Sequence, residues 1–210
     1  MYDLEEQEKI DALKAWWKQY GAMVIAAVIA FIGGVGGIQG WQYYQRSQAE
    51  QASILFSTLE EAVAKNDANE IRNVSAELIE RFGRTAYAGM AGMIAGKVEH
   101  DAGNLEVAAE RLEWVVEHAR SEPLRALARL RLAGVRLDQK QHDAALRLLD
   151  AGGGEAFTPL YADLRGDVLM AQGKTEEAVA AYDKALETTP EADPWRNVIQ
   201  VKRDAVGSLK

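Results

Sequence analysis

The sequence has no cysteine among its 210 residues. This absence excludes disulfide bonds, thiolate metal sites and cysteine nucleophiles. A domain that lies in an oxidising compartment without disulfides has to take its stability from packing. The chain is long enough to build one domain with an adequate core.

An excess of basic residues is also missing. The chain carries 24 lysines and arginines against 32 acids. Residues 1–46 hold five of these acids and four of the bases, so residues 47–210 hold 27 acids and 20 bases, a net charge of −7. Nucleic-acid binding and adsorption on anionic lipid both need a basic surface. The composition therefore disfavours both.

Proline is scarce, and no stretch shows the alternation of β-branched and polar residues that is typical of strands. The four prolines stand at boundaries between segments rich in good helix formers. These segments are about 11–19 residues long, the size of ordinary helices. The sequence predicts an all-α fold. The breaks between helices fall at Asn66-Asp67, Gly83, Gly103-Asn104, Ser121–Pro123, Lys140–His142, Gly152–Gly154, Gly173 and Thr189–Pro194.

One apolar run stands apart from the rest. Residues 21–41 carry no charge. A helix of that length measures about 31 Å, the thickness of the hydrocarbon core of a bilayer. We predict a transmembrane helix over residues 21–44, between a tail (1–20) and a soluble domain (45–210). The run is flanked by the aromatic residues that collect at headgroup layers, namely Trp16, Trp17, Tyr20, Trp41, Tyr43 and Tyr44.

The flanking charges predict the orientation of this span. Lys9, Lys14 and Lys18 precede it, and Arg46 alone follows closely. Basic residues are retained on the cytoplasmic side, so we expect the N-terminus inside and the domain outside. The alternative is a signal peptide cleaved near Ser47–Ala49. The run is longer than the ~7–15 apolar residues of a signal peptide and its lead is long and acidic, which favours an uncleaved anchor.

The segments behind the span repeat. Gly166 and Ala178 are small, which would let two antiparallel helices approach closely, and Gly173 would make the turn between them. Tyr182 and Ala185 are expected to form a large–small pair that faces the next helix. The spacing of a tetratricopeptide repeat is met within residues 159–190 by Gly166, Gly173, Ala178, Tyr182, Ala185 and Pro190, the last of which ends the second helix.

Two earlier copies share this spacing. Ala133 and Ala145 take the two small positions 33 residues upstream, and Gly96 and Ala108 take them a further 37 residues upstream. A divergent first hairpin at about residues 50–82 and a capping helix near the C-terminus would complete the stack, because an end repeat otherwise exposes an apolar face. The prediction is an α-solenoid of about four helical hairpins with a C-terminal capping helix.

At this point the chain resembles a known family, the single-span ancillary subunit of the bacterial Sec translocon. The resemblance covers nearly the whole length and keeps the order of the parts. It rests on the segments EEQEKIDALKAWWKQYG, GWQYYQ, RTAYAGMAGMIAGK, YADLRGDVLMAQGK and VIQVKRDAVGSL.

The resemblance implies an inner-membrane protein with a cytoplasmic N-terminus and a periplasmic tetratricopeptide-like domain. It implies two partners, the translocon channel subunits and a membrane-anchored periplasmic chaperone of the peptidyl-prolyl isomerase class. Newly exported, unfolded proteins are further expected partners. The family has no known catalytic site, so no catalytic residues transfer to this chain.

The residues themselves offer no recognisable chemistry either. His100, His118 and His142 have separations that match no local metal-ligand spacing. The run Gly152–Gly154 is neither preceded by a strand nor followed by Lys-Ser/Thr, so a flexible inter-repeat connection is favoured over a phosphate loop. We predict no enzyme, no cofactor and no metal.

Two features of the sequence point to binding. The first is a small-residue stripe in the span, where the backbone of another membrane helix would approach closely. The alternative is that glycine is simply common in membrane helices. The stripe consists of Ala26, Ala30, Gly33, Gly36, Gly37 and Gly40.

The second feature is the inner surface of the repeat stack. In this repeat class the first helix of each hairpin lines a groove. Methionine and leucine there would form an adaptable apolar strip, and aspartates would select basic segments. The alternative is that some of these residues belong to the core of the hairpins. The expected groove positions are Met90, Met93, Lys97, Leu127, Leu130, Leu160, Asp163, Asp167 and Met170.

The leading functional hypothesis is a non-enzymatic scaffold or chaperone cofactor at the Sec translocon. Two alternatives remain open. One is an assembly factor for another envelope machine, such as a secretion or pilus apparatus. The other is a signalling adaptor that uses the N-terminal tail. The identity of the partner separates these hypotheses.

Overall fold

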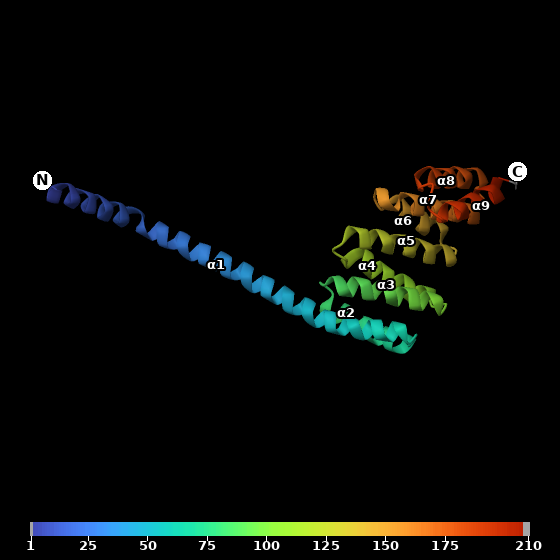
Figure 1. Cartoon of the computed structure of the whole chain (residues 1–210), viewed down its shortest axis with the longest axis horizontal. Coiled ribbons are helices and arrows are strands. Elements are labelled where there is room, and N and C mark those ends of the chain that lie inside the picture. Colours follow the sequence, from blue (N-terminus) through green and yellow to red (C-terminus); the bar gives the residue numbers. More distant parts are fainter. Residues whose placement is uncertain (1, 208–210) are drawn as a thin grey trace. The chain divides into compact units, whose positions relative to one another are not determined.

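A computed structural model describes residues 2–207 of the chain, with side chains from residue 8 onward. All the regular structure in that range is helical (Figure 1), as the sequence predicts. The elements are α1 (Tyr2–Ala64), α2 (Ala68–Phe82), α3 (Ala86–Asp101), α4 (Leu105–His118), α5 (Glu122–Asp138), α6 (His142–Asp150), the 3₁₀ turn η1 (Glu155–Phe157), α7 (Thr158–Ala171), α8 (Thr175–Thr188) and α9 (Trp195–Gly207).

The chain forms two compact units, of which the first ends at Gln48 and the second begins at Ala49. The first unit belongs to α1 alone, and its apolar side chains are exposed; Phe31, for example, is 72% exposed. The stretch Glu8–Ala64 of α1 contains an 18-residue window with a mean hydropathy of 2.2, of which 6% is buried. A helix that is apolar on all sides and unburied is suited to an apolar surrounding. Among the described residues it is the one helix long and apolar enough to cross a membrane.

The second unit is a stack of helical hairpins. The end of α1 packs with α2 around Leu59 and Leu78, and α3 with α4, α5 with α6, and α7 with α8 form the next three pairs. Helix α9 packs against α8 at the end of the stack. Because α3 contacts α5 and α5 contacts α7, the first helices of the pairs form one continuous row. Four hairpins and a capping helix confirm the predicted fold.

A left-handed residue stands in the turn of every hairpin. Asn66 has φ 54°, Gly103 80°, Lys140 60° and Gly173 75°. Such a residue ends the first helix and redirects the chain into the second. Glycine adopts this conformation without strain and asparagine tolerates it, whereas lysine rarely adopts it. The same turn therefore recurs at intervals of 37, 37 and 33 residues with different side chains.

The hairpins close on small residues, and in the last one Tyr182 fills the space beside a glycine. A Cβ atom at Gly166 would stand 2.4 Å from the Tyr182 ring, so this ring lies directly on the backbone of α7. The Tyr182 hydroxyl donates a hydrogen bond to Asp167 at 2.8 Å. The gap left by glycine thus admits the ring within its own hairpin, and the ring also belongs to the core cluster that contains Ile199 of α9, the next helix.

The same arrangement recurs in the second hairpin. A Cβ at Gly96 would stand 2.8 Å from Leu112. Leu112 follows Gly96 by 16 residues, which is also the separation of Tyr182 from Gly166. The small residues of the repeat pattern fill the remaining interface and are fully buried: Ala108, Ala133, Ala145, Ala178 and Ala185. Pro190 is exposed and follows the last residues of α8.

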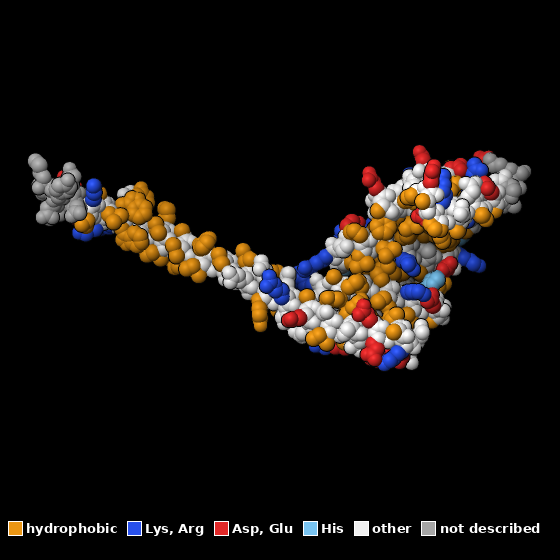
Figure 2. All heavy atoms as spheres, in the orientation of Figure 1, with side chains coloured by type: hydrophobic (Ala, Val, Ile, Leu, Met, Phe, Trp, Pro, Cys, Tyr) orange, Lys and Arg blue, Asp and Glu red, His pale blue; other side chains and the backbone are white. Residues whose placement is uncertain are grey.

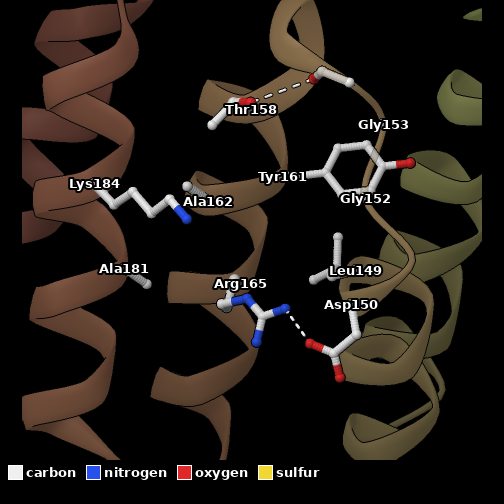
Figure 3. A pocket seen from close by; sticks show the side chains of 11 residues that line it. Leu149, Asp150, Gly152, Gly153, Thr158, Tyr161, Ala162, Arg165, Ala181 and Lys184 are labelled. Atoms are coloured by element: carbon white, nitrogen blue, oxygen red, sulfur yellow. Dashed lines mark hydrogen bonds and ion pairs between the residues drawn. The ribbon is translucent and has the colours of Figure 1, made fainter.

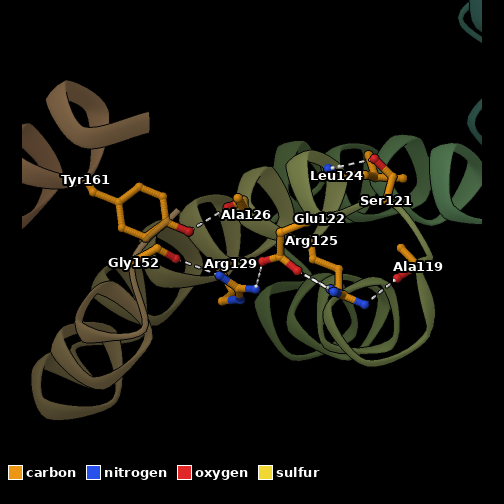
Figure 4. A network of polar contacts seen from close by, with 9 residues as sticks. All are labelled: Ala119, Ser121, Glu122, Leu124, Arg125, Ala126, Arg129, Gly152 and Tyr161. Atoms are coloured by element: carbon orange, nitrogen blue, oxygen red, sulfur yellow. Dashed lines mark hydrogen bonds and ion pairs between the residues drawn. The ribbon is translucent and has the colours of Figure 1, made fainter. Parts of the chain in front are cut away.

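Polar contacts hold the third and fourth hairpins together (Figure 4). Arg129 donates to the carbonyl of Gly152 at 2.6 Å and to Glu122 at 2.6 Å. The Tyr161 hydroxyl donates to the carbonyl of Ala126 at 2.7 Å. The bonds to Ala126 and Gly152 fix α7 and the glycine connection to α5.

Candidate functional site

The continuous row of first helices carries the residues that the sequence assigns to the groove. All of them lie on α3, α5 or α7. Most are half-buried, so they contact neighbours and still face outward. Figure 2 shows hydrophobic side chains gathered over the middle of the second unit. On α3 these residues are Met90, Met93 and Lys97; on α5, Leu127 and Leu130; on α7, Leu160, Asp163, Asp167 and Met170.

An open cavity of about 440 Å³ lies along α3 and α5. It is lined by three predicted groove residues, the apolar Met93 and Leu130 and the charged Lys97. Gly134 and Leu164 line it as well, and the sequence analysis missed both. Gly134 lies 37 residues after Lys97, the interval between the second and third hairpins, so the repeat register would have identified it.

Gly134 leaves the cavity open. A Cβ at this position would meet no atom within 4 Å. Glycine here does not serve a close helix contact, in contrast to Gly96 and Gly166. In the interior of a helix, glycine costs about 0.5–1 kcal/mol relative to alanine. Gly134 therefore keeps the cavity unfilled and lowers the stability of α5.

Charged side chains form the rim of the cavity. Lys97 is paired with Asp101, one turn further on α3, and this bond lowers the pKa of the Asp101 carboxyl. The His100 ring contacts Asp138 across the gap to α5, with Nε2 2.7 Å from Oδ2. Arg131 is exposed, and within residues 2–207 it has no hydrogen bond or ion pair. The acids of the rim are thus engaged, and one guanidinium is free.

The two aspartates of α7 have a different surrounding from the one expected. Asp163 is 5% exposed and accepts hydrogen bonds from the Trp195 indole at 3.1 Å and from Lys202 at 2.9 Å. Lys202 also donates to Asp167 at 2.8 Å. The chain's own α9 therefore engages both carboxylates, and a single ammonium group is shared between them. The expectation that they select basic segments of a partner does not fit this arrangement.

Lys202 is held as a cation by this site. Burial disfavours its charged form, but the hydrogen bonds to Asp167 and Asp163 outweigh burial and raise the pKa of the ammonium group. Burial and the bond to Asp167 raise the pKa of Tyr182 as well. The cluster thus fixes the cap to the last hairpin through charge as well as packing.

Helix α9 continues the register of the first helices of the hairpins. Ile199 and Val206 are buried against the last hairpin, as Tyr161 and Val168 are against the one before, at a constant offset of 38 residues. At this offset the groove position Leu160 corresponds to Val198, which is 39% exposed. The next groove position falls on Val201, which is 69% exposed. The sequence analysis treated this helix as a cap and missed both valines.

A second cavity of about 360 Å³ lies beside the glycine connection (Figure 3). Arg165 pairs with Asp150 at its edge. Gly152 and Gly154 have positive φ, and a Cβ at Gly153 would stand 2.8 Å from the Tyr161 ring. The run makes the predicted connection between hairpins, but Gly153 lies closely against Tyr161 of α7, whereas a flexible connection was expected.

The small residues of the first unit form a bare surface on α1. A Cβ at any of the glycines in this stripe would meet no atom within 4 Å, and Ala26 and Ala30 are exposed. Space for another helix backbone is therefore open along this face. The glycines concerned are Gly33, Gly36, Gly37 and Gly40.

Comparison with known proteins agrees with this architecture. Residues 14–208 match the family model described as a tetratricopeptide repeat-like domain. The crystal structure of MamA protein has a TM-score of 0.56 with 19% sequence identity, and the match covers 76% of this chain and 87% of that one. At this identity the similarity shows the fold alone.

Relatives of similar length match this chain over most of its length. The ancillary SecYEG translocon subunit of Neisseria gonorrhoeae is 35% identical over 97% of this chain and 98% of its own. The proteins of the same name from Haemophilus influenzae and Escherichia coli are 33% and 30% identical, over 89% and 87% of this chain and 91% and 88% of their own. The chain belongs to the family of ancillary SecYEG translocon subunits.

Proposed function

We propose that this protein is a membrane-anchored, non-enzymatic scaffold of the Sec translocon. Its span binds membrane partners, and its repeat domain holds polypeptide in the groove. The observation that carries the proposal is the open cavity along α3 and α5, whose floor is apolar and includes two of the expected groove residues. The location at the translocon is supported by relatives that are named as translocon subunits and that match this chain over nearly their whole length.

The proposed topology follows from the span and its charges. Residues 1–20 lie in the cytoplasm, residues 21–44 cross the inner membrane, and residues 45–210 form the periplasmic domain. The lysines before the span support this orientation, because basic residues are retained on the cytoplasmic side. The absence of cysteine suits a domain that folds outside the cytoplasm without needing oxidation.

Two surfaces serve two kinds of partner in this proposal. The glycine stripe of the span packs against a helix of the translocon channel subunits. The groove binds either newly exported, unfolded chains or a membrane-anchored periplasmic chaperone of the peptidyl-prolyl isomerase class. Both kinds of contact are non-covalent, so the role needs no catalytic residue and no cofactor.

Changing Gly33 and Gly37 to leucine should weaken association with the translocon. Each leucine side chain would hold the partner helix away, and interhelical contacts of this kind contribute about 1–2 kcal/mol, a fall of about five- to thirty-fold in affinity. Co-purification in mild detergent measures it. Leucine at Val28 and Val35, which lie on the opposite face of α1, is the matched control. Unchanged recovery of translocon subunits would mean that the stripe binds no partner and that the span only anchors the protein in the membrane.

The groove is tested by changing Met93 and Leu130 to aspartate together. Both side chains are half-buried at the cavity, so the domain should keep its helicity. An apolar ligand group would then meet unpaired carboxylates, and binding should fall by about tenfold or more. The measurement is co-purification of the chaperone and of unfolded exported proteins. If both persist at full level with a folded variant, the groove is not the binding surface.

A further inference from the structure

We propose that the cavity between α3 and α5 takes an apolar side chain that stands next to an acidic residue in the bound segment. This inference rests on the proposed function of the groove and names the chemistry of its ligand. It rests on three observations: the size of the cavity, its apolar floor, and the one unengaged charge at its rim.

The size and floor of the cavity fit a bulky apolar side chain. Its volume of about 440 Å³ is many times the roughly 30 Å³ that one water molecule takes up in the liquid. Met93, Leu130 and Leu164 supply the apolar surface. Gly134 leaves the middle of it unfilled. A leucine or phenylalanine of the ligand would be removed from water here, and methionine would adapt to its shape.

The rim favours an acid beside that side chain. An incoming carboxylate meets Arg131, whose guanidinium has free donors and matches the geometry of a carboxylate. The two acids of the rim already have partners within the chain, since Asp101 pairs with Lys97 and Asp138 contacts His100, so a basic residue of the ligand would share them. The two aspartates of α7 offer no alternative, because Lys202 engages them. The charges at this end of the groove thus select against basic segments.

The selection is local and opposes the net charge of the domain. The domain as a whole is acidic and repels an acidic ligand at long range, whereas the contact with Arg131 acts at short range. Binding of an acidic segment should therefore change little or improve at moderate salt, and then weaken at high salt as the exposed contact is screened.

The test uses the full-length protein in lipid nanodiscs and a set of short fluorescent peptides with blocked ends. The peptides share a Leu-Phe pair and differ only in its two neighbours, which are glutamate, glutamine or lysine. Fluorescence anisotropy should show that the glutamate peptide binds about two- to five-fold more tightly than the glutamine peptide, the range of an exposed ion pair. The lysine peptide should bind most weakly.

Two variants separate the parts of the argument. Arg131→Gln should remove the preference for glutamate and leave the glutamine peptide unaffected. Gly134→Leu should fill the cavity and weaken all three peptides by about tenfold or more. Arg147→Gln is the matched control, because Arg147 is an exposed arginine of α6 with no ion pair in the described part of the chain. It should change nothing.

Each outcome decides a different claim. If Arg131→Gln keeps the glutamate preference while Gly134→Leu blocks binding, the cavity is the site and the proposed acid selection is wrong. If Gly134→Leu leaves binding unchanged in a fully helical protein, the cavity is not the site, and the proposed function of the groove loses its main support. If no peptide binds at millimolar concentration, the inference is wrong, and the co-purification test with Met93 and Leu130 still decides the proposed function.

Discussion

Replacing Gly166 with alanine should destabilise the repeat domain, whereas the same replacement at Gly134 should stabilise it. Both glycines lie inside the first helix of a hairpin, so the helix propensity gained is the same, about 0.5–1 kcal/mol. At Gly166 the new Cβ would stand 2.4 Å from the Tyr182 ring. That ring is 2% exposed and is held by its bond to Asp167, so it has little room to move.

The clash at Gly166 should outweigh the propensity and leave a net loss of about 1–3 kcal/mol. For a domain of this size, each kcal/mol shifts the melting temperature by about 2–4 °C. Thermal unfolding of the full-length protein, followed by circular dichroism, would show a lower midpoint for Gly166→Ala and a higher one for Gly134→Ala. Shifts of the same sign would mean that Tyr182 does not lie on the α7 backbone.

Replacing Lys202 with methionine should loosen the cap. The substitution keeps the length of the side chain and removes the cation, which leaves Asp163 and Asp167 facing each other without it. Breaking a buried ion pair on one side costs about 3–5 kcal/mol. The Lys202 side chain is 29% exposed, so water offsets part of this, and we expect about 1–3 kcal/mol. Lys184→Met, at an exposed lysine of α8, is the control and should have little effect.

The same cluster predicts how stability depends on pH. The pKa of Lys202 is raised in the folded chain, so the folded state binds this proton more tightly than the unfolded state does. The contribution of Lys202 to the free energy of unfolding is complete below the ordinary lysine pKa of about 10.4. It is lost as the pH rises through the higher pKa that Lys202 has in the folded chain. The raised pKa of Tyr182 acts in the same direction, because the unfolded chain releases that proton first.

The free energy of unfolding should therefore fall above about pH 10, and less steeply in Lys202→Met than in the unchanged protein. Denaturant titrations between neutral and alkaline pH would measure both slopes. Equal slopes would mean that Lys202 is not held between the two carboxylates.

The fold could be predicted from the sequence because its signals are local. The breaks between helices coincide with residues that end or begin a helix, such as Gly103 and Gly173, and the small residues recur at a fixed interval. Asn66 and Lys140 have a left-handed backbone because they take the same place in the turn, but neither is a glycine, so residue type does not indicate it. Repeat position predicts this conformation better than residue type does.

The candidate site was harder to predict because its properties depend on distant partners. Asp163 and Asp167 look available in the sequence, yet Lys202 lies 39 and 35 residues further on and reaches them only because α9 packs there. No local pattern encodes that pairing. Gly134, in contrast, can be predicted from Lys97, which takes the same position one hairpin earlier. Val198 can be predicted in the same way from Leu160.

The most direct test of the central claim, that the groove holds polypeptide at the translocon, is photocrosslinking in living cells. A photoreactive amino acid in place of Leu130 lies at the cavity, and one in place of Arg147 lies on α6, outside it. We expect adducts from position 130 to exported chains or to a membrane-anchored periplasmic chaperone, and their loss when Gly134 is also changed to leucine. Adducts to these proteins from position 147 and none from position 130 would contradict the account.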